Sequence, residues 1–376
     1  MRAVVGGGAR QGLLDALSLC GRVAAQRSPT PILGCVLLKA APGGGLWLAA
    51  TDLDGRVEAT VAGVEVEAGG AAAVALPHRY FAELIRQLPA DEEIVLEAGP
   101  SGAEVRCAGS RHRVAGADPD AFPAGPPGGA AAEVRVPAQA LREAGRQVAV
   151  CTSDDIARPA LTGVLFEAGD EGLVLVATDG TRIAVKRVRA EAPEAAALVP
   201  ARAVAAVASA VGGDGDVAVS LADSHARFEW EPAWGRAVLA ARLLAAAFPD
   251  WRLVARVDAR AKVDVSRDGF LAALQRAALP VSLDSGIPAV RLELGPGGLA
   301  VTSRSASAGE AREEVPGAAV EGGPMEVPFN ADLLRDGLKA LPGEAAVLEL
   351  SGPRGLAALH GGDPSEYCYF ALPLAD

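Results

Sequence analysis

The sequence predicts an α+β protein made of three copies of one unit, each with two helices packed against antiparallel sheet. Three kinds of landmark recur along the 376 residues, with a period of about 125 residues. They are a helix preceded by an apolar residue and proline, a pair of apolar strands, and a Phe-Pro dipeptide. Because half of the composition is apolar, the chain can build a buried core in each unit.

The helix landmark is a segment of about three turns that follows Leu-Pro or Val-Pro. The prolines are Pro77, Pro200 and Pro328. Proline is tolerated at the first helical position, because the N–H that it lacks would be unpaired there. We therefore expect helices over 77–88, 200–211 and 329–340, each followed by a turn and a strand.

The strand landmark is a pair of apolar segments joined by a glycine-containing turn. The second strand of each pair ends at Thr51-Asp52, Thr178-Asp179 or Ser303-Arg304. The stretch Arg56–Val61 then alternates as half-buried antiparallel strands do. Phe122-Pro123, the third landmark, returns as Phe248-Pro249.

Each unit is also expected to have a helix before its strand pair, since apolar residues recur there at helical spacing. These helices are expected over 10–26, 138–151 and 267–278. Linkers rich in proline, glycine or polar residues fall at Pro123–Gly129 and Ala255–Ala261. The predicted domains are 1–126, 127–255 and 256–376.

Composition narrows the class of protein. The net charge is −12, which taken alone argues against a uniformly basic protein that binds nucleic acid or a membrane surface. No apolar run is long enough to span a membrane, and the start of the chain lacks the pattern of a signal peptide. The five cysteines are scattered, without Cys-x-x-Cys spacing, as is typical of reduced thiols in the cytoplasm. We expect a cytoplasmic protein with no cofactor and no structural metal.

The charge is unevenly distributed between the expected helices and the rest of the chain. The six helices carry 11 Lys and Arg against 6 Asp and Glu, a net charge of +5, so everything else sums to −17. DNA carries one negative charge per about 1.7 Å of helix axis, so positive helices suit binding that ignores base sequence. Arginine is also a good helix former, which leaves an explanation without DNA open.

These landmarks resemble the bacterial DNA polymerase III beta subunit family, the replicative sliding clamps. The resemblance runs from Arg10 to the C-terminus. Its most specific part is the Ala-Thr-Asp-Gly-x-Arg stretch at 177–182, supported by Arg158–Phe166, Phe248–Trp251 and Leu372–Leu374. It implies three similar domains per chain, a ring-shaped homodimer closed head to tail, and helices lining the ring around duplex DNA. The partners that it implies are the replicative DNA polymerase, the clamp loader and other proteins with a clamp-binding motif.

The resemblance also implies three groups of site residues. The DNA contacts would be Arg22, Arg27, Arg142, Arg146, Arg202 and Arg276. The dimer interface would include Arg106, Arg111, His112, Leu279, Glu310 and Glu313. The peptide-binding pocket would be lined by Leu161, Thr178, Gly180, Arg182, Ile183, Pro249, Val254, Phe370, Leu372, Pro373 and Leu374.

The chain departs from the family pattern at the rims of two of these sites. The tail ends Leu374-Ala375-Asp376, and Ala245–Ala247 precede Phe248 where a polar or glycine-containing turn is common. His112 replaces a frequent aromatic or apolar residue, and Pro280 follows Leu279. A divergent copy of the clamp that serves resistance or repair therefore remains an alternative to the housekeeping clamp.

An enzyme is the other alternative. Asp52-Leu53-Asp54-Gly55 imitates the Asp-x-Asp-Gly motif of phosphotransfer enzymes, in which one carboxylate attacks phosphate and the other moves a proton. That chemistry needs a parallel sheet with a helix following, whereas a strand is expected here. The glycine-rich Gly6–Gly12 lacks the Lys-Ser/Thr ending of a phosphate loop and is expected to form a terminal turn. The four histidines lack metal-ligand spacing, so catalytic and metal sites are expected to be absent.

Overall fold

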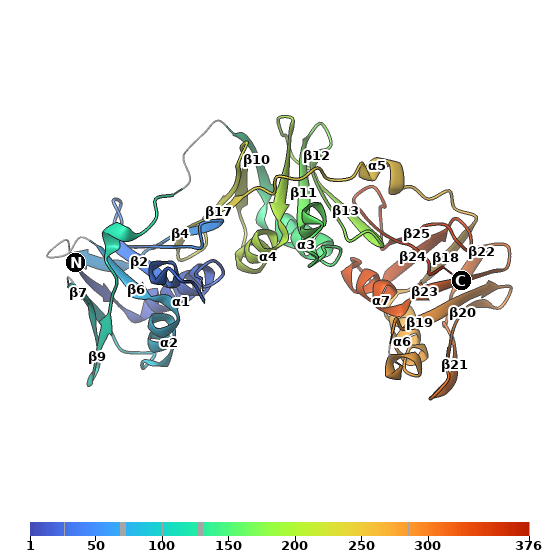
Figure 1. Cartoon of the computed structure of the whole chain (residues 1–376), viewed down its shortest axis with the longest axis horizontal. Coiled ribbons are helices and arrows are strands. Elements are labelled where there is room, and N and C mark those ends of the chain that lie inside the picture. The colour runs from blue at the N-terminus through green and yellow to red at the C-terminus, as the bar shows by residue number, and fades with distance from the viewer. Residues whose placement is uncertain (26, 68–72, 100, 126–130, 285, 376) are drawn as a thin grey trace. The chain divides into compact units, whose positions relative to one another are not determined.

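The three repeats have the same order of elements in the computed structural model, which describes residues 1–25, 27–67, 73–99, 101–125, 131–284 and 286–375 (Figure 1). Each repeat has a strand, a helix, a run of strands, a second helix and three final strands. The predicted α+β fold with three repeats is therefore confirmed. Gln26 of the first expected helix, residues 126–129 of the expected linker, and Asp376 lie outside the described residues.

The bounds of the elements follow the repeats. The first contains β1 (Arg2–Val5), α1 (Gly7–Cys20), β2 (Cys35–Ala40), β3 (Leu46–Thr51), β4 (Gly55–Val61), β5 (Val64–Glu67), β6 (Ala73–Pro77), α2 (His78–Gln87), β7 (Ile94–Gly99), β8 (Gly102–Cys107) and β9 (Ser110–Ala115). The second contains β10 (Ala132–Pro137), α3 (Ala138–Ala149), β11 (Gly163–Gly169), β12 (Gly172–Thr178), β13 (Arg182–Val188), β14 (Ala195–Pro200), α4 (Ala201–Ala210), β15 (Asp216–Leu221), β16 (His225–Trp230) and β17 (Gly235–Arg242). After the short helix α5 (Trp251–Val254), the third contains β18 (Ala261–Ser266), α6 (Arg267–Ala277), β19 (Ala289–Gly295), β20 (Gly298–Ser305), β21 (Gly309–Glu314), β22 (Ala319–Gly322), β23 (Met325–Asn330), α7 (Ala331–Ala340), β24 (Ala345–Leu350), β25 (Ala357–His360) and β26 (Tyr367–Ala371).

The chain forms two compact units, and the division runs through the middle repeat. The first unit comprises residues 1–142 and 190–243, and the second comprises 143–189 and 244–376. In the first unit, β17 pairs antiparallel with β4 and joins two repeats in the sheet β10-β15-β16-β17-β4-β3-β2-β6. In the second unit, β13 pairs in the same way with β26, within the order β11-β12-β13-β26-β25-β24-β18-β22. The last strand of one repeat thus extends a sheet of the preceding repeat at both junctions.

Each unit also has a smaller antiparallel sheet with an open edge. The order in the first unit is β5-β1-β7-β8-β9, and the order in the second is β21-β20-β19-β23. Strands β9 and β21 are edge strands, because each pairs on one side only within the described residues. Such an edge leaves a row of backbone donors and acceptors for another strand.

The helices bury one face against the sheets and against each other. Helix α1 contacts α2, β3 and β4, while α6 contacts α7, β20 and β21. Leu13, Leu17, Phe81 and Phe270 on these helices are almost fully buried. Their apolar area removed from water, at about 25 cal/mol per Å², is what stabilises the helices on the sheets.

A buried arginine joins the two helices of the first repeat. Arg10 on α1 is 7 % exposed, and its guanidinium donates to the carbonyl oxygens of Ile85 at 3.0 Å and Arg86 at 3.4 Å. It also donates to the carbonyls of Leu88 and Pro89. Ile85 and Arg86 lie in the last turn of α2, where no further turn supplies N–H donors, and Leu88 and Pro89 directly follow the helix. The positive charge of Arg10 therefore caps the C-terminal end of α2.

The bounds of α1 and α7 differ from the predicted ones. Helix α1 begins at Gly7 and ends at Cys20, so the expected glycine-rich turn is the first turn of the helix and the expected helix over 10–26 ends early. Position 12 of this helix requires glycine, because a Cβ there would lie 2.5 Å from Cβ of Trp234. Pro328 lies within β23, and α7 begins after Asn330, whose side-chain oxygen accepts from the backbone N–H of Asp332 at 2.9 Å. No helix in the described part of the chain is long and apolar enough to cross a membrane.

Candidate nucleic-acid and peptide interfaces

Four of the six arginines predicted to contact DNA are exposed and make no ion pair within the described residues. They are Arg22 and Arg27 after α1, and Arg142 and Arg146 on α3. The spacing of four residues puts Arg142 and Arg146 on one face of their helix. A guanidinium without a local carboxylate can bind phosphate without first breaking an ion pair.

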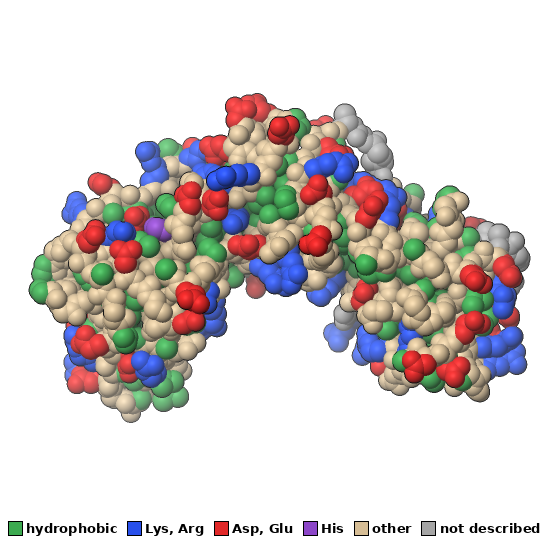
Figure 2. All heavy atoms as spheres, turned by 180° about the vertical axis from the view of Figure 1, so that it is seen from behind, with side chains coloured by type: hydrophobic (Ala, Val, Ile, Leu, Met, Phe, Trp, Pro, Cys, Tyr) green, Lys and Arg blue, Asp and Glu red, His purple; other side chains and the backbone are tan. Residues whose placement is uncertain are grey.

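The other two predicted DNA contacts are held by carboxylates. Arg202 on α4 binds Asp52 at 2.7 Å and Asp54 at 3.3 Å. Arg276 on α6 binds Glu313 on β21 at 2.7 Å. Figure 2 shows Lys and Arg next to Asp and Glu over much of the visible face. The charge count along the helices could not separate paired arginines from unpaired ones.

The Asp-x-Asp-Gly motif forms a tight turn between antiparallel strands β3 and β4. The Thr51 hydroxyl donates to the carbonyl oxygen of Gly55 at 2.7 Å. The Asp52 Oδ1 atom accepts from the backbone N–H of Asp54 at 3.1 Å and of Gly55 at 2.6 Å. Both carboxylates also bind Arg202, so one positive charge faces two negative ones. The motif is therefore a turn with an ion-pair cluster, and it lacks the parallel strand and following helix of the phosphotransfer site.

The Ala-Thr-Asp-Gly stretch forms the same turn between β12 and β13. The Thr178 hydroxyl donates to the carbonyl oxygen of Arg182 at 2.7 Å, and Asp179 Oδ1 accepts from the N–H of Thr181 at 2.8 Å. Gly180 has a φ of +93°, and Leu53 has a φ of +81° at the equivalent position of the first turn. Glycine adopts this left-handed conformation without the strain that leucine carries.

Arg182 in the second turn is held between two aspartates. Its guanidinium binds Asp179 at 2.8 Å and Asp336 on α7 at 2.8 Å, and its side chain is 14 % exposed. Burial acts to lower the pKa of Arg182, but the hydrogen bond with Asp336 and the nearby Tyr369 outweigh it and leave the pKa raised. Arg182 is therefore a fixed, neutralised part of the turn.

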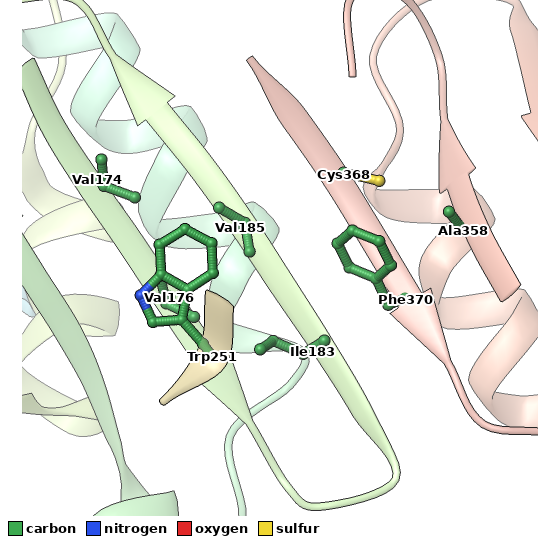
Figure 3. Packing of buried hydrophobic residues seen from close by; sticks show 8 residues of the cluster. All are labelled: Val174, Val176, Ile183, Val185, Trp251, Ala358, Cys368 and Phe370. Atoms are coloured by element: carbon green, nitrogen blue, oxygen red, sulfur yellow. The ribbon is translucent and has the colours of Figure 1, made fainter. Parts of the chain in front are cut away.

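An apolar cluster lies beside this turn, in the second compact unit. Trp251 on α5 packs over Val176, Ile183 and Val185, with Phe370 on the adjacent β26 (Figure 3). The Trp251 indole N–H donates to Glu167 at 3.1 Å, and the guanidinium of Arg252 stacks on the indole ring, 4.3 Å from its centre. Trp251 thus anchors the segment that carries Pro249 and Val254.

The residues predicted for the peptide pocket divide into buried and exposed members. Leu161, Ile183 and Phe370 are buried. Val254 is 58 % exposed and Leu372 is 44 % exposed. Pro249 and Gly180 are also exposed, while Thr178, Arg182, Pro373 and Leu374 are half-buried. The tail is fixed by backbone hydrogen bonds from Leu372 to Thr181 at 2.9 Å and from Leu374 to Pro328 at 2.8 Å.

Two further residues lie beside the predicted pocket residues. Trp251 is buried in the same cluster as Ile183 and Phe370, and Leu253, which is 73 % exposed, adds apolar surface beside Val254. The Phe248–Trp251 run was a visible landmark, but nothing in the sequence distinguished an anchoring tryptophan from an exposed one.

The residues predicted for the dimer interface lie on or near the two edge strands. Arg106 binds Glu97 at 2.9 Å and also binds Glu104, which Arg111 of β9 binds at 2.7 Å. These hydrogen bonds from Arg111 and Arg106 lower the pKa of Glu104.

The other predicted interface residues, Leu279, Glu310 and Glu313, lie in the second compact unit. Glu313 is engaged with Arg276, whereas Glu310 makes no ion pair within the described residues. His112 is half-buried on β9, and Leu279 after α6 is 64 % exposed. No group of three or more His, Cys, Asp and Glu side chains suited to a metal ion occurs in the described part of the chain.

Comparison with known protein families gives a consistent result for all three repeats. Residues 9–126 match the N-terminal domain of the DNA polymerase III beta subunit. Residues 135–250 match its central domain, and residues 256–374 match its C-terminal domain.

Individual relatives agree along the whole chain. The beta sliding clamp of Synechococcus elongatus is 30 % identical over 370 residues, covering 96 % of each chain. The crystal structure of the DNA polymerase III subunit beta from Pseudomonas aeruginosa has a TM-score of 0.90 at 25 % identity, covering 100 % of both chains. A sliding clamp from Bartonella birtlesii, bound to griselimycin, has a TM-score of 0.88 at 27 % identity and the same coverage.

Proposed function

Since the chain belongs to the DNA polymerase III beta subunit family, the bacterial sliding clamps, we propose that two copies close into a ring around duplex DNA and hold the replicative polymerase on it. Closure of the ring resists dissociation, so the contacts with DNA can be weak, diffuse and independent of sequence. Tethering converts repeated rebinding of the polymerase into an intramolecular event at high effective concentration. This role is topological and needs no catalytic residue, and its DNA partner implies a cytoplasmic protein.

The repeated junction is the observation that carries the proposal. At both junctions within the chain, the last strand of one repeat pairs with a strand of the preceding repeat. Strand β17 pairs with β4, which follows the Asp52 turn, and β26 pairs with β13, which follows the Asp179 turn. By the same rule, the remaining strands β9 and β21 should pair with each other. Strand β9 belongs to the first repeat and β21 to the third, so we expect β9 of one copy to pair with β21 of another. Such a head-to-tail contact gives a ring when it closes after two copies.

Charges on the two edge strands favour this pairing. Arg113 on β9 and Glu310 on β21 are exposed and make no ion pair within the described residues. Opposite charges on directly or diagonally facing residues stabilise paired strands by roughly 0.2–1 kcal/mol each. In Glu310→Arg, β21 would meet β9 with like charges, and we expect light scattering to show weaker dimers. Adding Arg113→Glu should restore the dimer, and a fully dimeric Glu310→Arg protein would contradict this interface.

Topological retention tests the ring itself. A ring loaded onto nicked circular DNA by the clamp loader should stay bound through gel filtration, and linearising the circle should release it. A control with Glu310→Arg separates retention by closure from simple electrostatic binding. A monomer that is retained equally on circular and linear DNA would refute the proposed function.

We also propose that the exposed residues around Trp251 form the docking site for the polymerase, the clamp loader and other clamp-binding proteins. Exposed apolar side chains on a rigid, buried base suit a short peptide with apolar anchors. Val254→Ser and Leu372→Ser should weaken binding of a polymerase fragment, because they remove apolar contact area. Tyr80→Ser, at an exposed position on α2, is the matched control. Unchanged affinity in a Pro249/Leu374 double variant would exclude this site.

A further inference from the structure

Arg202 and Arg22 line the same small hollow in the first compact unit, but only one of them is free. The hollow is formed by Arg22, by the β3–β4 turn with Asp52 and Asp54, and by the start of α4 with Arg202. Arg22 makes no ion pair within the described residues, whereas Arg202 is shared between the two aspartates at 2.7 Å and 3.3 Å. The two arginines therefore differ in what a phosphate must displace to reach them.

The two aspartates hold Arg202 in different ways. The Asp52 carboxylate is 21 % exposed and fixed by the turn, since its Oδ1 atom accepts two backbone N–H groups and leaves Oδ2 for Arg202. The Asp54 carboxylate is 58 % exposed, and among the described residues it makes only the longer contact with Arg202. Arg202 itself is 58 % exposed, so its guanidinium is open to solvent on the side away from the turn. A phosphate could reach it only in competition with these carboxylates.

We propose that Asp52 and Asp54 compete with a DNA phosphodiester for Arg202, so that the β3–β4 turn limits how tightly this hollow binds the duplex. This inference rests on the proposed binding of DNA and specifies how one contact is regulated. Arg22 can bind a phosphate without breaking an ion pair, whereas Arg202 must first leave Asp52 or Asp54. Weak contacts suit a protein that must move along DNA, because each phosphate bound tightly would have to be released at every step.

Asp54→Asn is the variant that tests the competition. It removes one carboxylate charge from Arg202 but leaves the Asp52 turn hydrogen bonds in place. If Arg202 gains one phosphate contact, the slope of log K against log salt should steepen by about 0.9. We expect affinity for a duplex oligonucleotide at low salt to rise several-fold, measured by fluorescence anisotropy.

Three controls make the result specific. Asp91→Asn makes the same change in net charge at an exposed turn, and Asp91 binds no arginine within the described residues, so this variant reports the general electrostatic effect. Arg202→Ala alone should weaken binding less than Arg22→Ala, because wild-type Arg202 is already engaged. Arg202→Ala combined with Asp54→Asn should cancel the gain, and melting temperatures check that every variant is folded.

The outcomes separate this inference from the proposed function. Equal affinities and slopes for Asp54→Asn and Asp91→Asn would overturn the competition, as would a loss in Arg202→Ala as large as that in Arg22→Ala. If the wild-type protein and all variants fail to bind the duplex at low salt, the inference is overturned; the proposed function fails only if the loaded wild-type protein is not retained on circular DNA. A gain in Asp54→Asn that disappears in the double variant supports the inference.

Discussion

Arg10 is expected to be the most costly single arginine to remove from the first repeat. Arg10→Met keeps the apolar stem and roughly fills the same volume, but it takes the donors away from four carbonyls in the last turn of α2 and just after it. The bonds to Ile85 and Leu88 are buried, whereas those to Arg86 and Pro89 are only partly buried and can be replaced by water. A buried acceptor left unsatisfied costs about 1–3 kcal/mol, so the two buried carbonyls predict a loss of about 2–6 kcal/mol.

Urea unfolding followed by circular dichroism, at fixed protein concentration, measures this loss. The midpoint should fall with little change in slope, because the surface exposed on unfolding stays nearly the same. Hydrogen exchange should speed up first in α1 and α2, since Arg10 joins these two helices. Arg22→Met is the matched control, because Arg22 is exposed and unpaired in the described residues, and its change should stay within about 0.5 kcal/mol. A midpoint for Arg10→Met equal to that of Arg22→Met would refute the role assigned to the buried guanidinium.

The remaining predictions concern glycine positions, turn strain and the thiols. Gly337→Ala should lower stability by about 1–3 kcal/mol, because its Cβ would lie 2.6 Å from the Tyr369 ring. Gly269→Ala should instead raise stability by about 0.5–1 kcal/mol, because its Cβ would lie 3.4 Å from the nearest atom, Cβ of Ser266. Thermal melts that rank the two variants the other way would contradict this packing. Leu53→Gly should stabilise the protein by about 0.5–1 kcal/mol in urea unfolding, because it relieves a φ of +81° at an exposed site, and a loss would show that the turn is unstrained. Burial raises the pKa of the Cys20 and Cys368 thiols from 9.0 to about 12, so the folded chain keeps protons that the unfolded chain releases. Unfolding free energy should therefore fall as pH rises from about 9 to 12, and a thiol reagent should label these cysteines only after unfolding; rapid labelling of folded protein at neutral pH would contradict their burial.

The repeat and its element order could be predicted because they depend on local patterns. Apolar periodicity, prolines and turn residues are set by neighbours in sequence, and each landmark appears three times. The first helix was misplaced because glycines at its start are poor helix formers. Burial of Leu13 and Leu17, and the close approach of Trp234 to Gly12, override that local preference.

The electrostatic detail of the candidate sites could not be predicted from the sequence. Arg202 and Asp52 are far apart along the chain and meet only through the pairing of β17 with β4. Arg182 meets Asp336 through the pairing of β13 with β26. A charge count treats all arginines as equal, whereas these contacts decide which ones are available to phosphate. The position of Trp251 over β12 and β13 likewise depends on long-range packing.

The strand pairing across repeats makes the middle repeat dependent on its neighbours. A fragment of residues 127–255 would lack β4 and β26, the pairing partners of β17 and β13. Both β17 and β13 would then be unpaired edge strands of one small fragment. An unpaired edge strand can pair with a strand of another molecule, so such a fragment would tend to polymerise end to end instead of remaining a monomer. The repeats visible in the sequence therefore do not coincide with the two compact units of the structure, because the division between those units runs through the middle repeat.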